Sequence, residues 1–369
     1  MYSWLKKNIG EVFYILPYLG IVKNPIQLII SLILHKKTIK IELINGVTSI
    51  FQFPDQFTTI IALLGAATFA TSCEKKSNNE IELSFDMENK FILNLTKMSI
   101  EDEKLLDLLY TGTLHGAAFI DSTKNNFKID GKTIKISKYN DKKIIEIGNG
   151  IKFYLDSITP GIIIEAFIQK IHDVDLLEDF NEKIVIDVGA ECGDTAIYYA
   201  SRGANVYSFE PIKGHYDAML KNISLNPELS KKITPINAAV GKDEILKFYQ
   251  SDKAEIAEAA SFVYNIHGKD AKTTEITGYS LKSAYEKFNL KHIDLLKMDC
   301  KGCEYFLTED DLINVDTIKI EYTNFDDSHK LEDLLKNIKK SGFQYTIYRH
   351  IPDYYKSNSF SGTLYAKRS

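Results

Sequence analysis

The sequence lacks the basic excess that a strong nucleic-acid binder usually carries. Its 369 residues contain 45 lysines and arginines against 50 aspartates and glutamates, so the formal net charge is −5. Apolar residues make up 44% of the chain, which is ordinary for a globular protein and excludes a wholly disordered one. We therefore expect a folded protein without a nucleic-acid partner.

Cysteine is also scarce. The four cysteines do not look like the framework of a secreted disulfide-rich domain, so we expect free thiols and a cytoplasmic protein. Cys300 and Cys303 flank Lys-Gly, a spacing that leaves metal or redox chemistry open. No second cysteine or histidine pair stands near to complete a four-ligand zinc site, and no metal is predicted.

Long apolar runs are missing as well. The N-terminal run is interrupted at Lys23-Asn24-Pro25, and the next one, Ile26 to Leu34, is much shorter than the roughly 20 residues of a spanning helix. No small-residue cleavage site follows. We expect a buried or amphipathic helix here; contact with a membrane surface is a less favoured alternative, and a true span is the least favoured.

Residues 1–175 are rich in hairpin signals and are predicted to form a mixed α/β region of unknown role. Short alternating segments and Asn-Gly or Asp-Gly turns predict paired strands. An apolar helix is expected between Gln56 and Thr71, followed by a polar loop, and a second helix from about Gly161 to His172. The predicted strand pairs are Thr38–Leu43 with Thr48–Phe53, Ile81–Phe85 with Lys90–Leu95, and Lys142–Ile147 with Ile151–Tyr154.

Residues 176–369 show a different pattern. Apolar segments typical of strands alternate with helical segments, which predicts a parallel sheet covered by helices. Two final segments, Gln344–Arg349 and Gly362–Lys367, predict an antiparallel hairpin at the edge of that sheet. The expected parallel strands are Ile184–Val188, Asn205–Phe209, Ile233–Ala238, Ile293–Met298 and Thr317–Tyr322.

The most informative segment is IVIDVGAECGDT, Ile184 to Thr195. A buried strand ends near Asp187, and a loop containing Gly189, Glu191 and Gly193 leads into a helix. Ligands bind at this end of parallel strands, and glycines let them approach the backbone. The loop lacks the glycine spacing that binds a pyrophosphate, and its acids suit a cationic cofactor such as S-adenosylmethionine. A purely structural role for Asp187 is the alternative.

A further acid follows the next strand. Glu210 lies about 20 residues after Gly189, the spacing at which a carboxylate binds ribose hydroxyls in doubly wound folds. These acids and glycines together predict a nucleoside-containing cofactor.

Four stretches in this order carry a family resemblance: IVIDVGAECGDT, VYSFEP, INAAVG and LLKMDCKGCE. The chain from about Ile184 to Tyr322 resembles the FkbM-type S-adenosylmethionine-dependent methyltransferases. The resemblance implies a class I methyltransferase fold, a Rossmann-like seven-stranded sheet whose last strand is antiparallel. It also implies methyl transfer to a hydroxyl oxygen of a small molecule or glycan, with Asn237 and Ala238 near the adenine.

This chain departs from the family pattern at two positions. Glu191 stands where the family has asparagine, and Lys301 stands where it has a carboxylate. Asp299, at the end of the fourth strand, is the first candidate for general base or for orienting the acceptor, and Glu321 is the second. Lys301 and Glu304 are candidate substrate contacts. Structural roles stay open for all four, as a loop acid, an ion pair, a solvated lysine or a helix-start acid.

Two other classes of protein remain as alternatives. An NAD(P)-dependent oxidoreductase would share the glycine loop and the ribose acid, although the phosphate-binding glycine spacing is absent. A non-catalytic binding protein could retain the fold, and the substitutions at Glu191 and Lys301 leave that alternative open. The identity of the acceptor and the oligomeric state cannot be deduced from the residues.

Overall fold

The structure is a computed structural model, and it describes residues 12, 15–84, 90–95, 100–101, 104–105, 108, 119–121, 126–129, 132–148, 150–173, 179–251, 260–265, 268, 271–324, 327, 329–352 and 360–368. The chain divides into two compact units. One comprises Met1–Gly150 with Tyr154–Asp156, and the other Ile151–Phe153 with Ser157–Ser369. Compactness does not establish independent folding, so the predicted domain boundary at residue 175 stays a prediction.

The first unit contains small antiparallel sheets. A pair, a triplet and a five-stranded sheet occur in the order β1-β2, β3-β4-β5 and β10-β9-β8-β7-β6. Its helices are η1 (Leu16–Ile21), α3 (Pro25–Ile33), α4 (Phe57–Phe69) and η2 (Leu155–Ser157). Its strands are β1 (Thr38–Glu42), β2 (Thr48–Gln52), β3 (Ser72–Ser77), β4 (Glu80–Ser84), β5 (Lys90–Asn94), β6 (Phe119–Asp121), β7 (Asn126–Ile129), β8 (Lys132–Tyr139) and β9 (Lys142–Ile147). Strand β10 (Ile151–Tyr154) is divided, because Ile151–Phe153 belong to the second unit and Tyr154 to the first.

The predicted strand pairs of this unit are confirmed, and so is the apolar helix α4. The polar loop predicted after that helix is wrong, because Ser72–Ser77 forms strand β3 and pairs with β4. Only Cys73 of β3 is buried, and the remaining side chains are exposed. An exposed edge strand needs few apolar residues, so its sequence cannot be distinguished from that of a polar loop.

No helix among the described residues is long and apolar enough to cross a membrane. Helix α3 has nine residues, and Leu28, Ser31 and Leu32 are buried on its inner face. Residues 1–11 and 13–14, on which the alternative of membrane contact largely rests, lie outside the described part of the chain.

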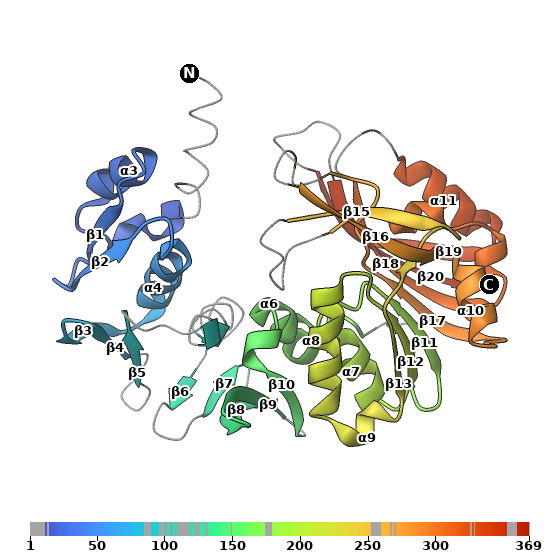
Figure 1. Cartoon of the computed structure of the whole chain (residues 1–369), viewed down its shortest axis with the longest axis horizontal. Helices are drawn as coiled ribbons and strands as arrows, with labels where there is room; N and C mark the ends of the chain where they lie inside the picture. The colour runs from blue at the N-terminus through green and yellow to red at the C-terminus, as the bar shows by residue number, and fades with distance from the viewer. Residues whose placement is uncertain are drawn as a thin grey trace. The chain divides into compact units, whose positions relative to one another are not determined.

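The second unit is built on a seven-stranded sheet with the order β13-β12-β11-β17-β18-β20-β19 (Figure 1). The first five of these strands are parallel to one another, and β20 is antiparallel to both neighbours. This confirms the predicted parallel sheet with an antiparallel last strand. Its strands are β11 (Ile184–Val188), β12 (Asn205–Phe209), β13 (Ile233–Ile236), β17 (Ile293–Met298), β18 (Val315–Asn324), β19 (Phe343–Pro352) and β20 (Phe360–Arg368).

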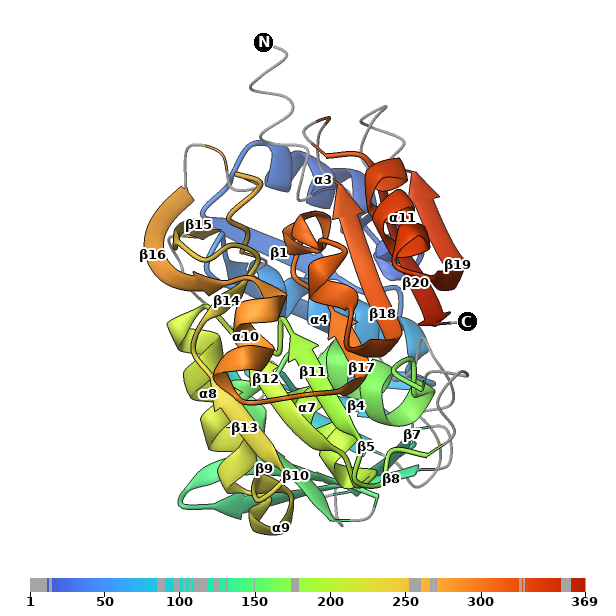
Figure 2. The ribbon, with the colours of Figure 1, turned by 90° about the vertical axis from the view of Figure 1, so that its right-hand side faces the viewer.

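Helices cover both faces of this sheet. Figure 1 shows α7 (Asp194–Ser201) and α8 (Lys213–Ser224) on one face, and α10 (Leu281–Lys287) and α11 (Leu331–Lys340) on the other. Figure 2 views the same sheet from the side of α10 and α11. Because both faces are covered, the central strands are mostly apolar, and every residue of β17 is buried, including Asp294 and Lys297.

Shorter elements frame the carboxyl ends of the parallel strands. A three-stranded sheet, β14-β16-β15, follows β13 and was not predicted. The helix expected near residues 161–172 is present as α6 (Pro160–Ile163) continued by a π-helical turn, η3 (Ile164–Gln169). The remaining elements are β14 (Ala239–Val240), β15 (Ile245–Ser251), β16 (Ala271–Tyr279), α9 (Pro227–Ser230), η5 (Cys303–Phe306) and η6 (Asp310–Leu312).

Candidate active site

A cavity of about 330 Å³ lies within the second unit, at the carboxyl ends of β11, β12 and β17. Its volume is at the lower end of the range typical of small-molecule sites. The predicted residues that line it are Gly189, Glu191, Glu210, Ala238, Asp299, Lys301 and Glu321. Those that do not line it are Asp187, Gly193, Asn237 and Glu304.

Packing requires both glycines of the loop after β11. Gly189 has φ +78°, and a Cβ there would lie 2.0 Å from the carbonyl oxygen of Asp299. Gly193 has φ +83°, and a Cβ would lie 2.8 Å from Cγ of Met219. Packing therefore requires glycine at both positions, because backbone or side chain of a neighbouring element fills the space of a Cβ. Approach of a ligand to this loop stays a prediction.

Glu210 follows β12 directly and fixes two loops. One carboxylate oxygen accepts a hydrogen bond from the backbone N–H of Glu191, and the other from that of Ile212, both at 2.8 Å. His215 Nδ1 lies 3.6 Å from the same carboxylate. The side chain is almost fully buried and still borders the cavity. A carboxylate held in this way has a fixed orientation toward a bound ligand.

Glu191 brings a second carboxylate to the cavity. It adopts a left-handed backbone conformation, φ +44°. The hydroxyl of Thr159 donates a hydrogen bond of 2.9 Å to its carboxylate. Burial raises the pKa of Glu191, and the nearby His215 counteracts part of that effect. The acid therefore lies in a wall where negative charge is costly unless a cation or a hydrogen-bond donor faces it.

Asp187 lies beneath the cavity, where its charge is already balanced. It is fully buried, and Lys297 Nζ is 2.9 Å from its carboxylate. The same ammonium donates to the carbonyl oxygen of Gly189 at 3.2 Å and to the hydroxyl of Thr195 at 3.4 Å. Asp187 thus adds no net negative charge to the loop, which corrects the electrostatic argument made from the sequence. Its predicted contact with a cofactor stays a prediction.

The INAAVG segment contributes three residues to the cavity: Ala238, Ala239 and Val240. Ala238 is buried and lines it. Asn237 is exposed, and its amide donates to the carbonyl oxygens of Glu210 and Pro211, at 2.9 and 3.1 Å. Asn237 therefore does not line the cavity. Its amide instead stabilises the turn that contains Glu210.

Asp299, Lys301 and Glu321 form a charged group that lines the cavity. Lys301 Nζ lies 2.6 Å from Asp299 and 3.6 Å from Glu321. Burial alone would raise the pKa of Asp299, but the ammonium groups of Lys301 and Lys297 outweigh it, and the pKa lies below its ordinary value. Burial opposes the charge of Lys301, yet Asp299 and Glu321 raise its pKa. The lysine is thus held as a cation between two carboxylates.

Glu304 does not line the cavity, although its neighbour Cys303 does. Its carboxylate accepts hydrogen bonds from the backbone N–H groups of Gly302 and Thr323, at 2.8 and 2.9 Å. Burial raises its pKa to about 7. These bonds join the start of η5 to β18, so the contacts of Glu304 are structural, and substrate contact stays a prediction.

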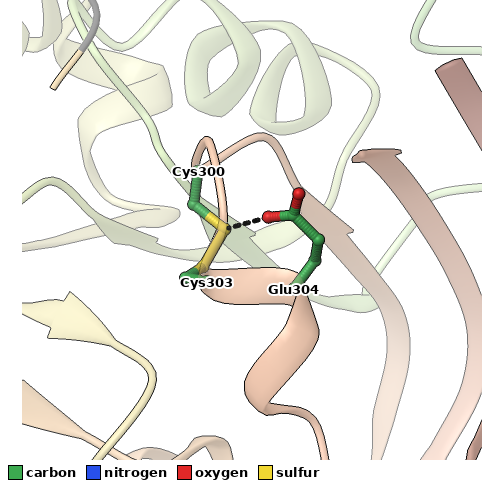
Figure 3. Close-up of side chains that lie close together, drawn as sticks. All are labelled: Cys300, Cys303 and Glu304. Atoms are coloured by element: carbon green, nitrogen blue, oxygen red, sulfur yellow. Dashed lines mark hydrogen bonds between the residues drawn. A yellow bond between two sulfur atoms is a disulfide. The ribbon is translucent and has the colours of Figure 1, made fainter. Parts of the chain in front are cut away.

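Cys300 and Cys303 both line the cavity and are joined by a disulfide (Figure 3). The expectation of free thiols is wrong for this pair. It holds for Cys73 and Cys192, which are free and buried. Sequence alone could not distinguish the alternatives, because the spacing fits free thiols, a metal site or a disulfide equally.

Other residues of the site were missed. Thr159, Ile162 and Glu165 line the cavity from the segment that precedes β11, which carried no recognisable motif. Lys297 could have been found: a lysine inside a run predicted to be a buried strand requires a buried partner. The facing strand offers Asp187 for that role.

The sheet order and the position of the cavity define a class I methyltransferase fold. Residues 187–345 match the family model of the methyltransferase FkbM domain. This part of the chain is therefore an FkbM methyltransferase domain, of the S-adenosylmethionine-dependent class. No curated protein sequence matches the chain.

Among solved structures, the chain is similar to several methyltransferases at low scores. Precorrin-6y C5,15-methyltransferase from Geobacter metallireducens has a TM-score of 0.31 and 8% identity, over 51% of this chain and 81% of the other. Magnesium protoporphyrin IX methyltransferase from Synechocystis PCC 6803 has a TM-score of 0.30 and 13% identity, over 56% and 78%. Trm5b from Pyrococcus abyssi has a TM-score of 0.34 and 12% identity, over 63% and 62%. Scores this low carry no argument about substrate.

Proposed function

We propose that this protein transfers a methyl group from S-adenosylmethionine to a hydroxyl oxygen of a small molecule or glycan. The observation that carries the proposal is the cavity of the FkbM domain, because Glu210 and Gly189 line it together with Asp299, Lys301 and Glu321. We assign the first two residues to a nucleoside cofactor and the other three to an acceptor.

The cofactor side fits S-adenosylmethionine in its chemistry. Glu210 offers an oriented carboxylate for ribose hydroxyls, while Ile212, Ala238 and Val240 offer apolar surface for a base. Glu191 supplies a carboxylate for a cationic group. When bound, this cofactor supplies a methyl group activated on a sulfonium. We assign Asp187 to holding the loop through Lys297.

On the acceptor side, the proposal assigns orientation to Asp299 and proton removal to Glu321. A hydroxyl oxygen is a weak nucleophile, so a carboxylate that accepts its proton assists transfer. Asp299 has a lowered pKa and is paired with Lys301, which makes it a weak base but a good hydrogen-bond acceptor. Glu321 is the more exposed acid, at 42% of its side chain, and lies farther from the lysine.

Charge at the acceptor side favours a neutral, hydroxyl-bearing acceptor. The ammonium of Lys301 is already engaged by two carboxylates. An anionic acceptor would have to compete with both of them for it, at a desolvation cost. The proposal therefore favours a sugar or a neutral metabolite. The absence of a nucleic-acid partner, and a cytoplasmic location, remain expectations that no observation tests.

Cofactor binding is tested by calorimetric titration of the full chain with S-adenosylhomocysteine and, separately, with NAD. We expect binding of the first alone. Glu210→Ala should weaken it by at least about tenfold, because a charged hydrogen-bond acceptor contributes about 1.5–3 kcal/mol. Glu228→Ala, at a carboxylate exposed on the surface, is the matched control. Full affinity in Glu210→Ala, with its circular dichroism unchanged, would remove the ribose assignment.

Activity is tested by transfer of radiolabelled methyl from S-adenosylmethionine into fractionated cell extract, with mass spectrometry of the labelled product. We expect label on an ether oxygen of a neutral, hydroxyl-rich compound. Binding of the cofactor without transfer to any fraction would favour the non-catalytic alternative.

A further inference from the structure

The Cys300-Lys301-Gly302-Cys303 turn places a disulfide in the wall of the cavity. The turn follows β17 and leads into η5, and the Cα atoms of the two cysteines are 5.5 Å apart. Both cysteines border the same space as Asp299 and Lys301. A reactant that enters the cavity can therefore reach the bond.

The two sulfurs differ in access. Cys303 is buried at 2% exposure, whereas Cys300 is half-buried. The carboxylate of Glu304 lies 3.4 Å from Sγ of Cys300, and burial raises its pKa to about 7. Cys300 is thus the sulfur open to attack, and an acid that can gain or lose a proton near neutral pH stands beside it.

The turn does not depend on the disulfide for its shape. The N–H of Gly302 is bound by Glu304, and the carbonyl of Lys301 accepts a hydrogen bond of 2.7 Å from the hydroxyl of Ser261. A bond that closes so short a loop restricts the unfolded chain little, so it contributes less stability than one closing a long loop. We therefore expect the surrounding fold to stay in place when the bond opens.

The other two cysteines provide the contrast. Burial raises the pKa of Cys73 to about 11, and it raises the pKa of Cys192 well above its ordinary value. Buried thiols of this kind are inert, because the thiolate is the reactive form. Reactivity toward thiols and disulfides is confined, among the four, to the pair at the cavity.

We propose that Cys300 and Cys303 form a thiol–disulfide exchange site whose reaction partner is a dithiol reductant. A thiolate of the reductant attacks Sγ of Cys300, the bond between the two sulfurs breaks, and Cys303 leaves with the electron pair and takes up a proton. The second thiolate of the reductant then attacks its own sulfur in the mixed disulfide, and Cys300 leaves and is protonated. The reductant ends as a disulfide, and the protein gains two thiols.

A metal site is the competing interpretation of the same side chains, because Cys300, Cys303 and Glu304 could together offer three ligand atoms. Both oxygens of Glu304 already accept backbone hydrogen bonds, and a structural zinc site takes four ligands. Exchange chemistry needs neither a further ligand nor release of Glu304.

The test uses the full chain purified without reductant and trapped with iodoacetamide in its native state. Mass spectrometry should find Cys300 joined to Cys303. Incubation with dithiothreitol under native conditions should make both alkylatable, and oxidised dithiothreitol should rejoin them, with circular dichroism unchanged. Free thiols before reduction, resistance to native dithiothreitol, or stoichiometric zinc released on alkylation would each overturn the proposal.

Single variants test which sulfur is attacked. With Cys303→Ser, the remaining Cys300 should form a mixed disulfide with glutathione disulfide at least about tenfold faster than Cys303 does in Cys300→Ser. Cys192→Ser, which leaves the pair intact, should behave as wild type. Equal rates in the two single variants would contradict attack at Cys300. Because none of these measurements involves methyl transfer, their outcome is independent of the proposed function.

Discussion

Gly189 is the position at which a single added carbon should do most damage to the site. Its Cβ would fall 2.0 Å from the carbonyl oxygen of Asp299, and its φ of +78° is strained for any side chain. We expect Gly189→Ala to lower the free energy of unfolding by about 3 kcal/mol or more, as overpacking and backbone strain add. Urea denaturation followed by far-ultraviolet circular dichroism measures it.

Gly342 provides the matched control for that experiment. It also has positive φ, +84°, but the nearest atom to its Cβ position is 3.7 Å away. Gly342→Ala should therefore cost only the strain of the left-handed backbone, about 1–2 kcal/mol. Equal losses in the two variants would mean that the contact with Asp299 is not what requires glycine at 189.

Glu304 should make the protein less stable as the pH rises from about 4 to about 7. Burial raises its pKa to about 7 in the folded protein, above the ordinary value of about 4.3 in the unfolded chain. Between these two pKa values the folded state binds one proton more than the unfolded state. The stabilisation that this proton gives the folded state is complete below about pH 4 and is lost as the pH rises to about 7.

Glu304→Gln should remove this dependence. The difference in the free energy of unfolding between wild type and variant should change by up to about 3 kcal/mol from pH 5 to pH 8, in favour of the variant. A constant offset is also expected, because an amide can accept only one of the two backbone hydrogen bonds. Glu228→Gln, at an exposed acid, is the control and should show no such change. A parallel pH profile in Glu304→Gln would contradict the assignment.

At the scale of elements, Lys297 joins two strands and a helix beneath the cavity. It stands on β17 and contacts Asp187 of β11, the carbonyl of Gly189 and the hydroxyl of Thr195 in α7. Lys297→Met would leave the Asp187 carboxylate buried without a counter-charge. We expect a loss of about 3–5 kcal/mol, measured by urea denaturation.

The pH dependence of that variant separates charge from packing. Without the ammonium, burial should raise the pKa of Asp187 further, so the variant should be less destabilised at pH 5 than at pH 8. Adding Asp187→Asn should restore part of the loss. Lys183→Met removes a more exposed pair with Asp294 and should cost at most about 1 kcal/mol. A loss independent of pH would identify a packing defect instead.

How far sequence predicts this fold depends on how much of each element is buried. β11, β12 and β17 are mostly apolar and mostly buried, and their predicted bounds are correct. β3 was missed because it is exposed along most of its length. α11 was missed although its buried residues Leu331, Leu334 and Ile338 recur at helical spacing.

The same distinction applies to the site. Residues on the loops after β11 and β12 follow recognisable motifs, and Gly189, Glu191 and Glu210 do border one cavity. Thr159 and Glu165 reach that cavity from a distant segment without any motif. Asn237 and Glu304 were predicted to contact the cofactor and the substrate, but neither lines the cavity. Both side chains form hydrogen bonds with backbone groups instead.

At the scale of the whole molecule, residues 151–175 decide where the methyltransferase unit begins. The ammonium of Lys319, buried on β18, donates to the carbonyl of Ile171 at 2.9 Å and lies 2.7 Å from Nδ1 of His172. Tyr199 donates to the carbonyl of His172. A chain that starts at residue 176 would lack these partners and would leave Lys319 buried without them.

Two fragments test this boundary. We expect residues 151–369 to unfold in one calorimetric transition and to bind S-adenosylhomocysteine within about threefold of the full chain, since the described cavity residues all lie in that unit. Residues 176–369 should be less stable by about 3 kcal/mol or more, because a buried cation and buried carbonyls lose their partners. Because both fragments contain Glu210 and the Gly189 loop, a difference between them can come only from residues 151–175. Equal stability and equal affinity would instead support a domain boundary at 175, and would mean that Lys319 finds other partners when Ile171 and His172 are absent.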